Sequence, residues 1–140
     1  MSKEKKGVHT GIIEKDADGN FFCGPYLLDY KQVVAGFKIG DEVIIFTPAY
    51  DCYDPTIRLF GGVPVSVQLK SPDYRPDWEE VSEKITSKTR MIIVNTPHNP
   101  SGTLFSENDM RRLEDIAQKH NLIVISDEVY EHIIFDGELH

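Results

Sequence analysis

The 140-residue sequence is poor in cysteine and has no long hydrophobic run. No apolar stretch approaches the roughly 20 residues that a membrane-spanning helix needs. Cys23 and Cys52 show no metal-ligand spacing and no partner pattern, so we expect free thiols in a reducing compartment, the cytoplasm. Residues 1–6 are polar and rich in lysine with no apolar stretch behind them, which argues against a secretory signal.

The sequence also lacks a basic stripe. Its net charge is −8, and residues 41–140 carry nine basic and 18 acidic side chains, which argues against a nucleic-acid partner. Glu128, Glu131 and His132 lack a zinc-ligand pattern, and no Gly-x-Ser-x-Gly hydrolase motif occurs, so we expect no metal site and no such hydrolase. What remains is a globular composition, 40% apolar and 27% charged, of about one domain's length.

The first 39 residues give mixed signals. Gly11–Glu14 and Phe21–Cys23 flank the turn cluster Asp16–Asn20, and this arrangement predicts a hairpin. Leu27–Phe37 has apolar side chains roughly on one face and is interpreted as a helix. Because the pattern changes near Gly40, we expect residues 1–39 to form an atypical N-terminal segment, separate from residues 40–140.

From Gly40 onward, short apolar runs alternate with helical stretches. The runs are Val43–Phe46, Val63–Val67, Met91–Val94 and Leu122–Ile125, and the helical stretches are Asp51–Phe60, Asp77–Ile85 and Ser106–His120. Bounded, β-branched runs are typical of strands buried on both faces of a parallel sheet. The sequence therefore predicts an α/β fold with a mostly parallel sheet in a three-layer α/β/α arrangement.

The third helical stretch has signals at both ends. Ser106 is a suitable N-cap, with Asp109 three residues later, and Asn121 is a suitable residue for the C-terminal end. We therefore expect well-defined boundaries for this helix.

Polar and aromatic side chains follow three of the apolar runs. The segments are Thr47–Tyr50, Asn95–Gly102 and Ser126–Tyr130. Ligands of α/β folds bind beyond the carboxyl ends of the strands, so these segments are expected to meet at one edge of the sheet.

These segments resemble a known family. Asn95–Gly102 together with Ser126–Tyr130 is similar to the class I/II aminotransferases, members of pyridoxal 5′-phosphate (PLP) fold type I, and Pro48–Tyr53 resembles the kynurenine, glutamine and methionine aminotransferases. The resemblance covers about residues 40–140. It implies the central part of the large, PLP-binding domain, an L-amino acid and an α-keto acid as substrates, and a homodimer in the intact family.

The resemblance implies a role for each matched residue. Asp127 matches the carboxylate that pairs with the pyridine nitrogen and keeps it protonated. Asn99 and Tyr130 match the amide and phenol donors to the ring's 3′ oxygen. Tyr50 matches the aromatic side chain that stacks on the ring. Tyr53 lines the substrate pocket or simply packs.

Other family residues are not matched. The Schiff-base lysine of the family lies beyond the strand that carries Asp127, and no lysine up to His140 matches it, so no catalytic residue is assigned and residues 1–140 alone are expected to be inactive. Gly24 falls where the phosphate-binding turn has a glycine, but the residues after it depart from the family's small, hydroxylated pattern, which puts that role in doubt. His98 is interpreted as part of a turn.

Several alternatives stay open on the sequence alone. A PLP-dependent carbon–sulfur lyase uses much the same ring-binding residues. The chain is also compatible with a non-catalytic remnant that serves as a binding or dimerisation module, and with an unrelated flavodoxin-like or receiver domain.

Overall fold

A computed structural model describes residues 13–15, 21–23, 26–28 and 38–135, which belong to two units, Met1–Lys38 and Ile39–His140. The first unit contains an antiparallel sheet of β1 (Ile13–Lys15), β2 (Phe21–Cys23) and β3 (Tyr26–Leu28). The predicted hairpin is confirmed by the pairing of β1 with β2. The predicted helix is wrong at its start, because Leu27 pairs with Phe22 in this sheet, and its remainder lies outside the described residues.

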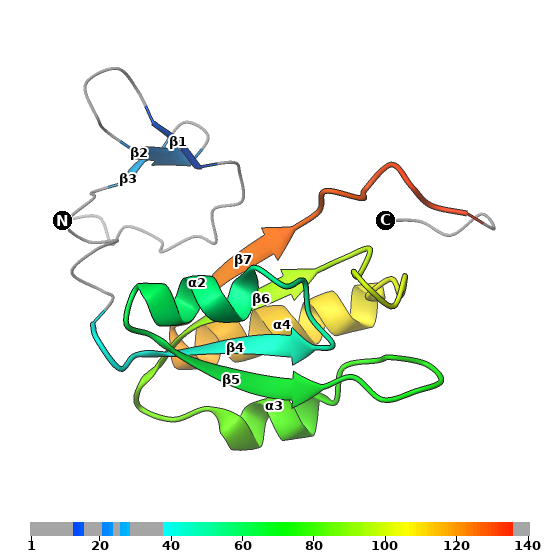
Figure 1. The fold of residues 1–140 in the computed structure, drawn as a ribbon, viewed down its shortest axis with the longest axis horizontal. Helices are drawn as coiled ribbons and strands as arrows, with labels where there is room; N and C mark the ends of the chain where they lie inside the picture. The colour runs from blue at the N-terminus through cyan, green and yellow to red at the C-terminus, as the bar shows by residue number, and fades with distance from the viewer. Residues whose placement is uncertain (1–12, 16–20, 24–25, 29–37, 136–140) are drawn as a thin grey trace, which may run out of the picture. The chain divides into compact units, whose positions relative to one another are not determined.

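The second unit is built on a parallel sheet of four strands in the order β5-β4-β6-β7 (Figure 1). Their bounds are Glu42–Thr47 for β4, Val63–Gln68 for β5, Thr89–Asn95 for β6 and Ile123–Asp127 for β7. Each predicted apolar run lies on one of these strands, except that Leu122 precedes β7. Because the strands are parallel, their carboxyl ends share one edge of the sheet.

Helices connect consecutive strands and cover both faces of the sheet. They are α2 (Tyr53–Leu59), α3 (Trp78–Lys84) and α4 (Glu107–His120). The helix α2 lies on one face, whereas α3 and α4 share a core with the other (Figure 1). The predicted three-layer α/β/α arrangement is confirmed. None of the helices described is long and apolar enough to cross a membrane.

The main core lies between the sheet and the α3–α4 face. Alternating side chains of the two interior strands point into it, Ile44 and Phe46 from β4 and Ile92 and Val94 from β6, all at most 4% exposed. Phe46 makes edge-to-face contacts with Trp78 and Phe105, at centroid distances of 5.9 and 5.5 Å. This packing fixes the interior strands whose ends carry the candidate site.

The start of α4 is tied to α3 by a buried carboxylate. Asp109 accepts hydrogen bonds from the Ser106 backbone N–H and hydroxyl at 2.8 and 2.6 Å and from Trp78 Nε1 at 2.9 Å. Ser106 Oγ in turn accepts from the Asp109 N–H, which completes a capping box. At the other end, Asn121 adopts a left-handed conformation with φ 53°. Both predicted helix signals are therefore present.

The two outer strands depart from the predicted burial. β4 and β6 are buried along most of their length, but β5 is largely exposed, and Ile123, Val124 and Ile125 of β7 are 36–44% exposed. The expectation of burial on both faces is wrong for β5 and β7. The reason is positional: within the part of the chain that the structure describes, each outer strand has a single neighbouring strand.

Candidate functional site

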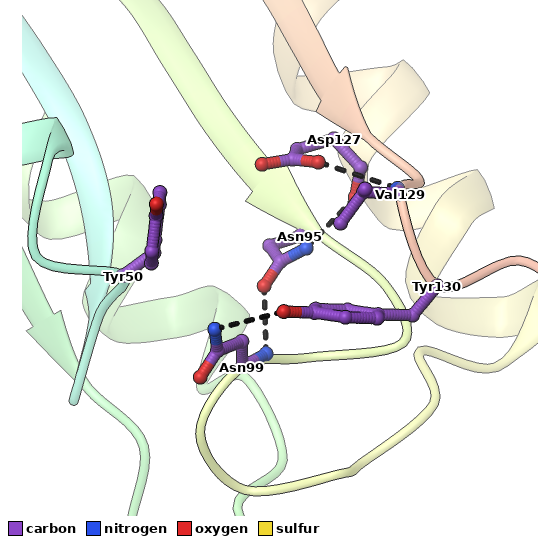
Figure 2. A pocket seen from close by; sticks show the side chains of 6 residues that line it. All are labelled: Tyr50, Asn95, Asn99, Asp127, Val129 and Tyr130. Atoms are coloured by element: carbon purple, nitrogen blue, oxygen red, sulfur yellow. Dashed lines mark hydrogen bonds between the residues drawn. The ribbon is translucent and has the colours of Figure 1, made fainter. Parts of the chain in front are cut away.

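The carboxyl ends of β4, β6 and β7 surround a cavity of about 220 Å³ (Figure 2). The lining residues are Tyr50, Asn95, Asn99, Asp127, Val129 and Tyr130. All four side chains predicted to hold a cofactor ring are among them. The structure therefore brings together residues that are up to 80 positions apart in the sequence.

Asn95, the last residue of β6, organises the floor of this cavity. Its side chain is 4% exposed, and its Nδ2 donates to the main-chain carbonyl of Asp127 at 2.9 Å. Its Oδ1 accepts from the Asn99 backbone N–H at 2.7 Å (Figure 2). One buried amide thus holds the end of β7 and the backbone of the loop that carries Asn99.

Asn99 and Tyr130 form a pair of donors. Asn99 Nδ2 donates to the Tyr130 hydroxyl at 3.2 Å, so the amide and the phenol lie side by side (Figure 2). The second amide hydrogen of Asn99 and the phenol hydrogen of Tyr130 are then available for a common acceptor. Such a pair suits an anionic oxygen on a ligand.

Asp127 places a carboxylate at the end of β7. Its Oδ1 accepts from the Val129 N–H at 3.3 Å, and its Oδ2 accepts from the Tyr53 hydroxyl. Burial and this hydrogen bond to Asp127 raise the pKa of Tyr53 above its ordinary value, so Tyr53 remains a neutral donor. The first turn of α2 is thereby joined to the acid of the site.

Tyr50 lies on the β4 side of the cavity, apart from the other labelled side chains (Figure 2). It is 45% exposed and packs edge-to-face against Tyr53, with ring centroids 5.8 Å apart. An aromatic side chain that is half exposed and packed against a second ring offers exposed ring surface for stacking.

The set of groups defines the kind of ligand that fits. A carboxylate suits a protonated ring nitrogen, an amide and a phenol suit an anionic oxygen, and an aromatic wall suits a flat ring. At about 220 Å³ the cavity is smaller than the ~300–1,000 Å³ of typical ligand pockets. The described residues therefore supply only part of the walls that a whole cofactor needs.

Neither Tyr53 nor His98 is among the lining residues of the cavity. Tyr53 donates a hydrogen bond to Asp127. Gly24 lies outside the described residues. His98 is buried in the loop after β6, in keeping with its interpretation as part of a turn.

Two lining residues were not among the predicted ligands, Asn95 and Val129. A signal for Asn95 was present, since a single amide ends the wholly apolar run Met91–Val94. Val129 carried no comparable signal, because an apolar residue after a strand is equally common in packing.

Comparisons with known proteins agree on one family. The family model "Aminotransferase class I and II" matches residues 28–139. Methionine aminotransferase of Escherichia coli K12 is 41% identical over 127 residues, which cover 91% of this chain and 33% of that protein. Mouse kynurenine–oxoglutarate transaminase 3 is 42% identical over 147 residues, covering 95% of this chain and 32% of that protein.

A solved structure gives the same result at the level of the fold. The aromatic aminotransferase from Pyrococcus horikoshii OT3 superimposes with a TM-score of 0.72 at 42% identity, over 76% of this chain and 29% of that one. The chain spans about a third of the length of the curated relatives it matches. Their matches also extend upstream of residue 40, into the segment that was expected to be atypical.

A parallel α/β sheet with polar and aromatic groups at its carboxyl edge defines an α/β ligand-binding domain, here the large-domain fold of the PLP fold type I enzymes. The chain belongs to the class I and II aminotransferase family.

Proposed function

We propose that this chain carries the ring-binding part of a PLP-dependent aminotransferase active site. The observation that supports the proposal is the shared cavity of Tyr50, Asn99, Asp127 and Tyr130 at three strand ends. Together these four side chains complement three features of a hydroxypyridine ring, namely its nitrogen, its 3′ oxygen and its flat face. When bound, PLP supplies an electron sink for the carbon next to the amino group of a substrate.

Each residue has a role that follows from its surroundings. Asp127 holds a proton on the ring nitrogen, because its carboxylate is kept in place by Tyr53 and by the Val129 N–H. Asn99 and Tyr130 donate to the ring's 3′ oxygen, since their donor atoms already lie 3.2 Å apart. Tyr50 stacks on the ring and limits its tilt.

For the intact protein we propose transfer of an amino group from an L-amino acid to an α-keto acid, within a homodimer in the cytoplasm. The donor class is kynurenine-, glutamine- or methionine-like. Support for this class comes from the segment Pro48–Tyr53 and from the relatives' names, methionine aminotransferase and kynurenine–oxoglutarate transaminase. Whichever donor is used, residues 1–140 contribute to holding the ring.

We also propose that residues 1–140 alone do not transaminate. Proton transfer in this reaction needs a positioned amine, and no lysine lines the cavity among the residues that the structure describes. With a stacking wall and ring donors but no such amine, the isolated chain is a weak binder of the cofactor ring.

The test combines trapping with turnover. The purified chain is incubated with PLP and reduced with borohydride, and its lysines are surveyed by mass spectrometry, while amino acid and keto acid turnover is assayed in parallel. We expect scattered, substoichiometric modification of surface lysines and no turnover. A single stoichiometric phosphopyridoxyl-lysine together with turnover would contradict the proposal that the amine is missing.

The role of Asp127 is tested in a complete enzyme built around this segment. Asp127→Asn keeps the shape of the side chain but removes its charge. By analogy with the loss of other charge-stabilising groups, we expect turnover to fall by roughly 10²–10³ or more, with PLP still bound. Near-normal turnover in Asp127→Asn would refute the assigned role.

A further inference from the structure

Asn95 pairs with Asp127 at the last position of the ladder between β6 and β7. Its side chain extends this pairing, because Nδ2 donates to the Asp127 carbonyl at 2.9 Å, and the Thr96 N–H donates to the same carbonyl at 3.1 Å. At its other end, Oδ1 accepts from the Asn99 N–H at 2.7 Å (Figure 2). The amide therefore connects the main chains of two residues that carry ring-binding side chains.

The two partners fix the orientation of this amide. A main-chain carbonyl only accepts hydrogen bonds and a main-chain N–H only donates them, so the nitrogen must face Asp127 and the oxygen must face Asn99. Asn95 is 4% exposed, so the loss of either hydrogen bond would leave a buried polar group without a partner. The amide thus holds its two neighbours at one separation.

This separation matters because of the groups that the two neighbours present to the cavity. Asp127 presents a carboxylate for a ring nitrogen, and Asn99 presents its amide, beside the Tyr130 hydroxyl, for the 3′ oxygen. In a hydroxypyridine the distance between these two ligand atoms is fixed by the ring. A site engages both atoms at once only when its own groups are held at the matching distance.

A second connection joins the same two sides of the cavity at a different level. Asn99 Nδ2 donates to the Tyr130 hydroxyl at 3.2 Å, which joins the tips of two side chains that both bind the ring. Asn95 acts instead on the backbone, at the end of the ladder between two paired strands. It is therefore the group that sets where these side chains start.

We propose that Asn95 is a positioning residue that sets the separation between Asp127 and Asn99, and thereby makes the site selective for pyridine rings that carry an oxygen at position 3. The inference rests on the proposed function. An asparagine that only stabilised the end of β6 would, when replaced, weaken the binding of every such ring equally. Replacement of a positioning residue changes the preference between rings.

The test compares two probes that differ in one oxygen, pyridoxine 5′-phosphate and 3-deoxypyridoxine 5′-phosphate. Both lack the aldehyde that would react with surface lysines. Their dissociation constants are measured by ¹H–¹⁵N titration of the unmodified chain and of Asn95→Leu, which keeps the approximate size of the side chain but removes both hydrogen bonds. Asn108→Leu is the matched control, because Asn108 is exposed on α4.

In the unmodified chain we expect the 3′ oxygen to strengthen binding about 10-fold, the size expected for one hydrogen bond to a charged group. In Asn95→Leu this advantage should fall to about 2-fold or less, because the two ends of the ring are no longer engaged together. Asn108→Leu should keep the full advantage. An undiminished advantage in folded Asn95→Leu would overturn the inference and leave the proposed function intact.

The remaining outcomes are also decisive. If circular dichroism shows that Asn95→Leu is unfolded, Asn95→Ser carries the same test, because its single short hydroxyl cannot bridge both partners. Equal binding of the two probes by the unmodified chain would overturn the selectivity itself. If the unmodified chain binds neither probe, the proposed function fails, and the role of Asn95 fails with it.

Discussion

The neighbouring strands β6 and β7 look alike in sequence but differ in burial. Met91–Val94 and Leu122–Ile125 are both apolar runs of four residues, and both are followed within two residues by a site residue, Asn95 or Asp127. Yet Ile93 is 8% exposed, whereas its pairing partner Ile125 is 40% exposed. The apolar run thus predicts a strand, but its burial depends on what lies on either side of that strand.

The comparison is tested most strongly by alanine substitutions of two residues that pair across β6 and β7. Ile93→Ala removes a buried side chain from β6, a strand that has a neighbouring strand on each side. We therefore expect the free energy of unfolding to fall by about 2–5 kcal/mol. Ile125→Ala, directly across the ladder, should cost less than half as much, because its side chain already contacts water. Urea denaturation followed by circular dichroism measures both, and equal losses would mean that β7 is covered in solution.

The helix α4, which connects β6 to β7, gives the next largest effect. Asp109→Ala leaves Trp78 Nε1 and the Ser106 N–H without their acceptor, so we expect a loss of about 1–3 kcal/mol in unfolding free energy. Glu107→Gln is the control in the same helical turn, with a carboxylate that is 81% exposed, and it should change stability by less than about 0.5 kcal/mol. Thermal unfolding of the two variants in the same buffer distinguishes the loss of a buried hydrogen-bonded carboxylate from a general effect of removing one negative charge.

The hydrogen bond from Tyr53 of α2 to Asp127 of β7 should contribute less to the free energy of unfolding. Tyr53→Phe removes the hydroxyl that donates to Asp127, and the partly exposed location limits the expected loss to about 0.5–1.5 kcal/mol. A second readout is the tyrosine absorbance during alkaline titration. Since the pKa of Tyr53 is raised, the variant should lack a tyrosine that ionises above the ordinary tyrosine range, and an unchanged titration in that range would contradict the hydrogen bond.

As the pH falls, the protein should lose the contribution of His98 to its stability before it loses that of Asp109. The pKa of His98 is lowered by burial, so the folded state resists protonation there, and stability should fall as pH drops below the ordinary histidine value of 6.5. Its hydrogen-bond partner Ser101 carries no charge that would offset the loss. His98→Gln should flatten the stability profile between about pH 6.5 and 5.

Asp109 contributes in a lower window. Burial opposes its ionisation, but hydrogen bonds from Ser106 and Trp78 outweigh this and lower the pKa of Asp109 below 3.8. The carboxylate therefore stabilises the fold above that value, and the contribution is lost as pH falls through the lowered pKa. If stability were lost in a single step at one pH, and neither His98→Gln nor Asp109→Ala changed that step, the roles given to His98 and Asp109 would be contradicted.

The sequence predicted the strands and helices of the second unit because its periodicities are local. Ser106, Asp109 and Asn121 marked the ends of α4 through interactions within a turn or two of the chain. The strand β3 was missed, since Tyr26–Leu28 is too short to distinguish a strand from the start of a helix. The exposure of β7 was missed because it depends on neighbours that are distant in sequence.

For the site, the sequence predicted which strand ends meet but not how their side chains are joined. Tyr50, Asn99, Asp127 and Tyr130 follow predicted strands, and parallel topology alone brings such residues to one edge. The hydrogen bonds from Tyr53 to Asp127 and from Asn99 to Tyr130 link residues 74 and 31 positions apart. Such pairings depend on the final spacing of the strands, which no local pattern specifies.

The central claim is that this chain holds a hydroxypyridine ring at the carboxyl ends of β4, β6 and β7. Amide and side-chain shifts in ¹H–¹⁵N spectra during titration with pyridoxine 5′-phosphate test it most directly. The account predicts saturable shifts confined to residues 47–53, 95–102 and 126–130, with the Asn99 side-chain amide among the largest. Shifts spread over the surface, or saturable shifts that leave Asn99 and Tyr130 unmoved, would contradict it.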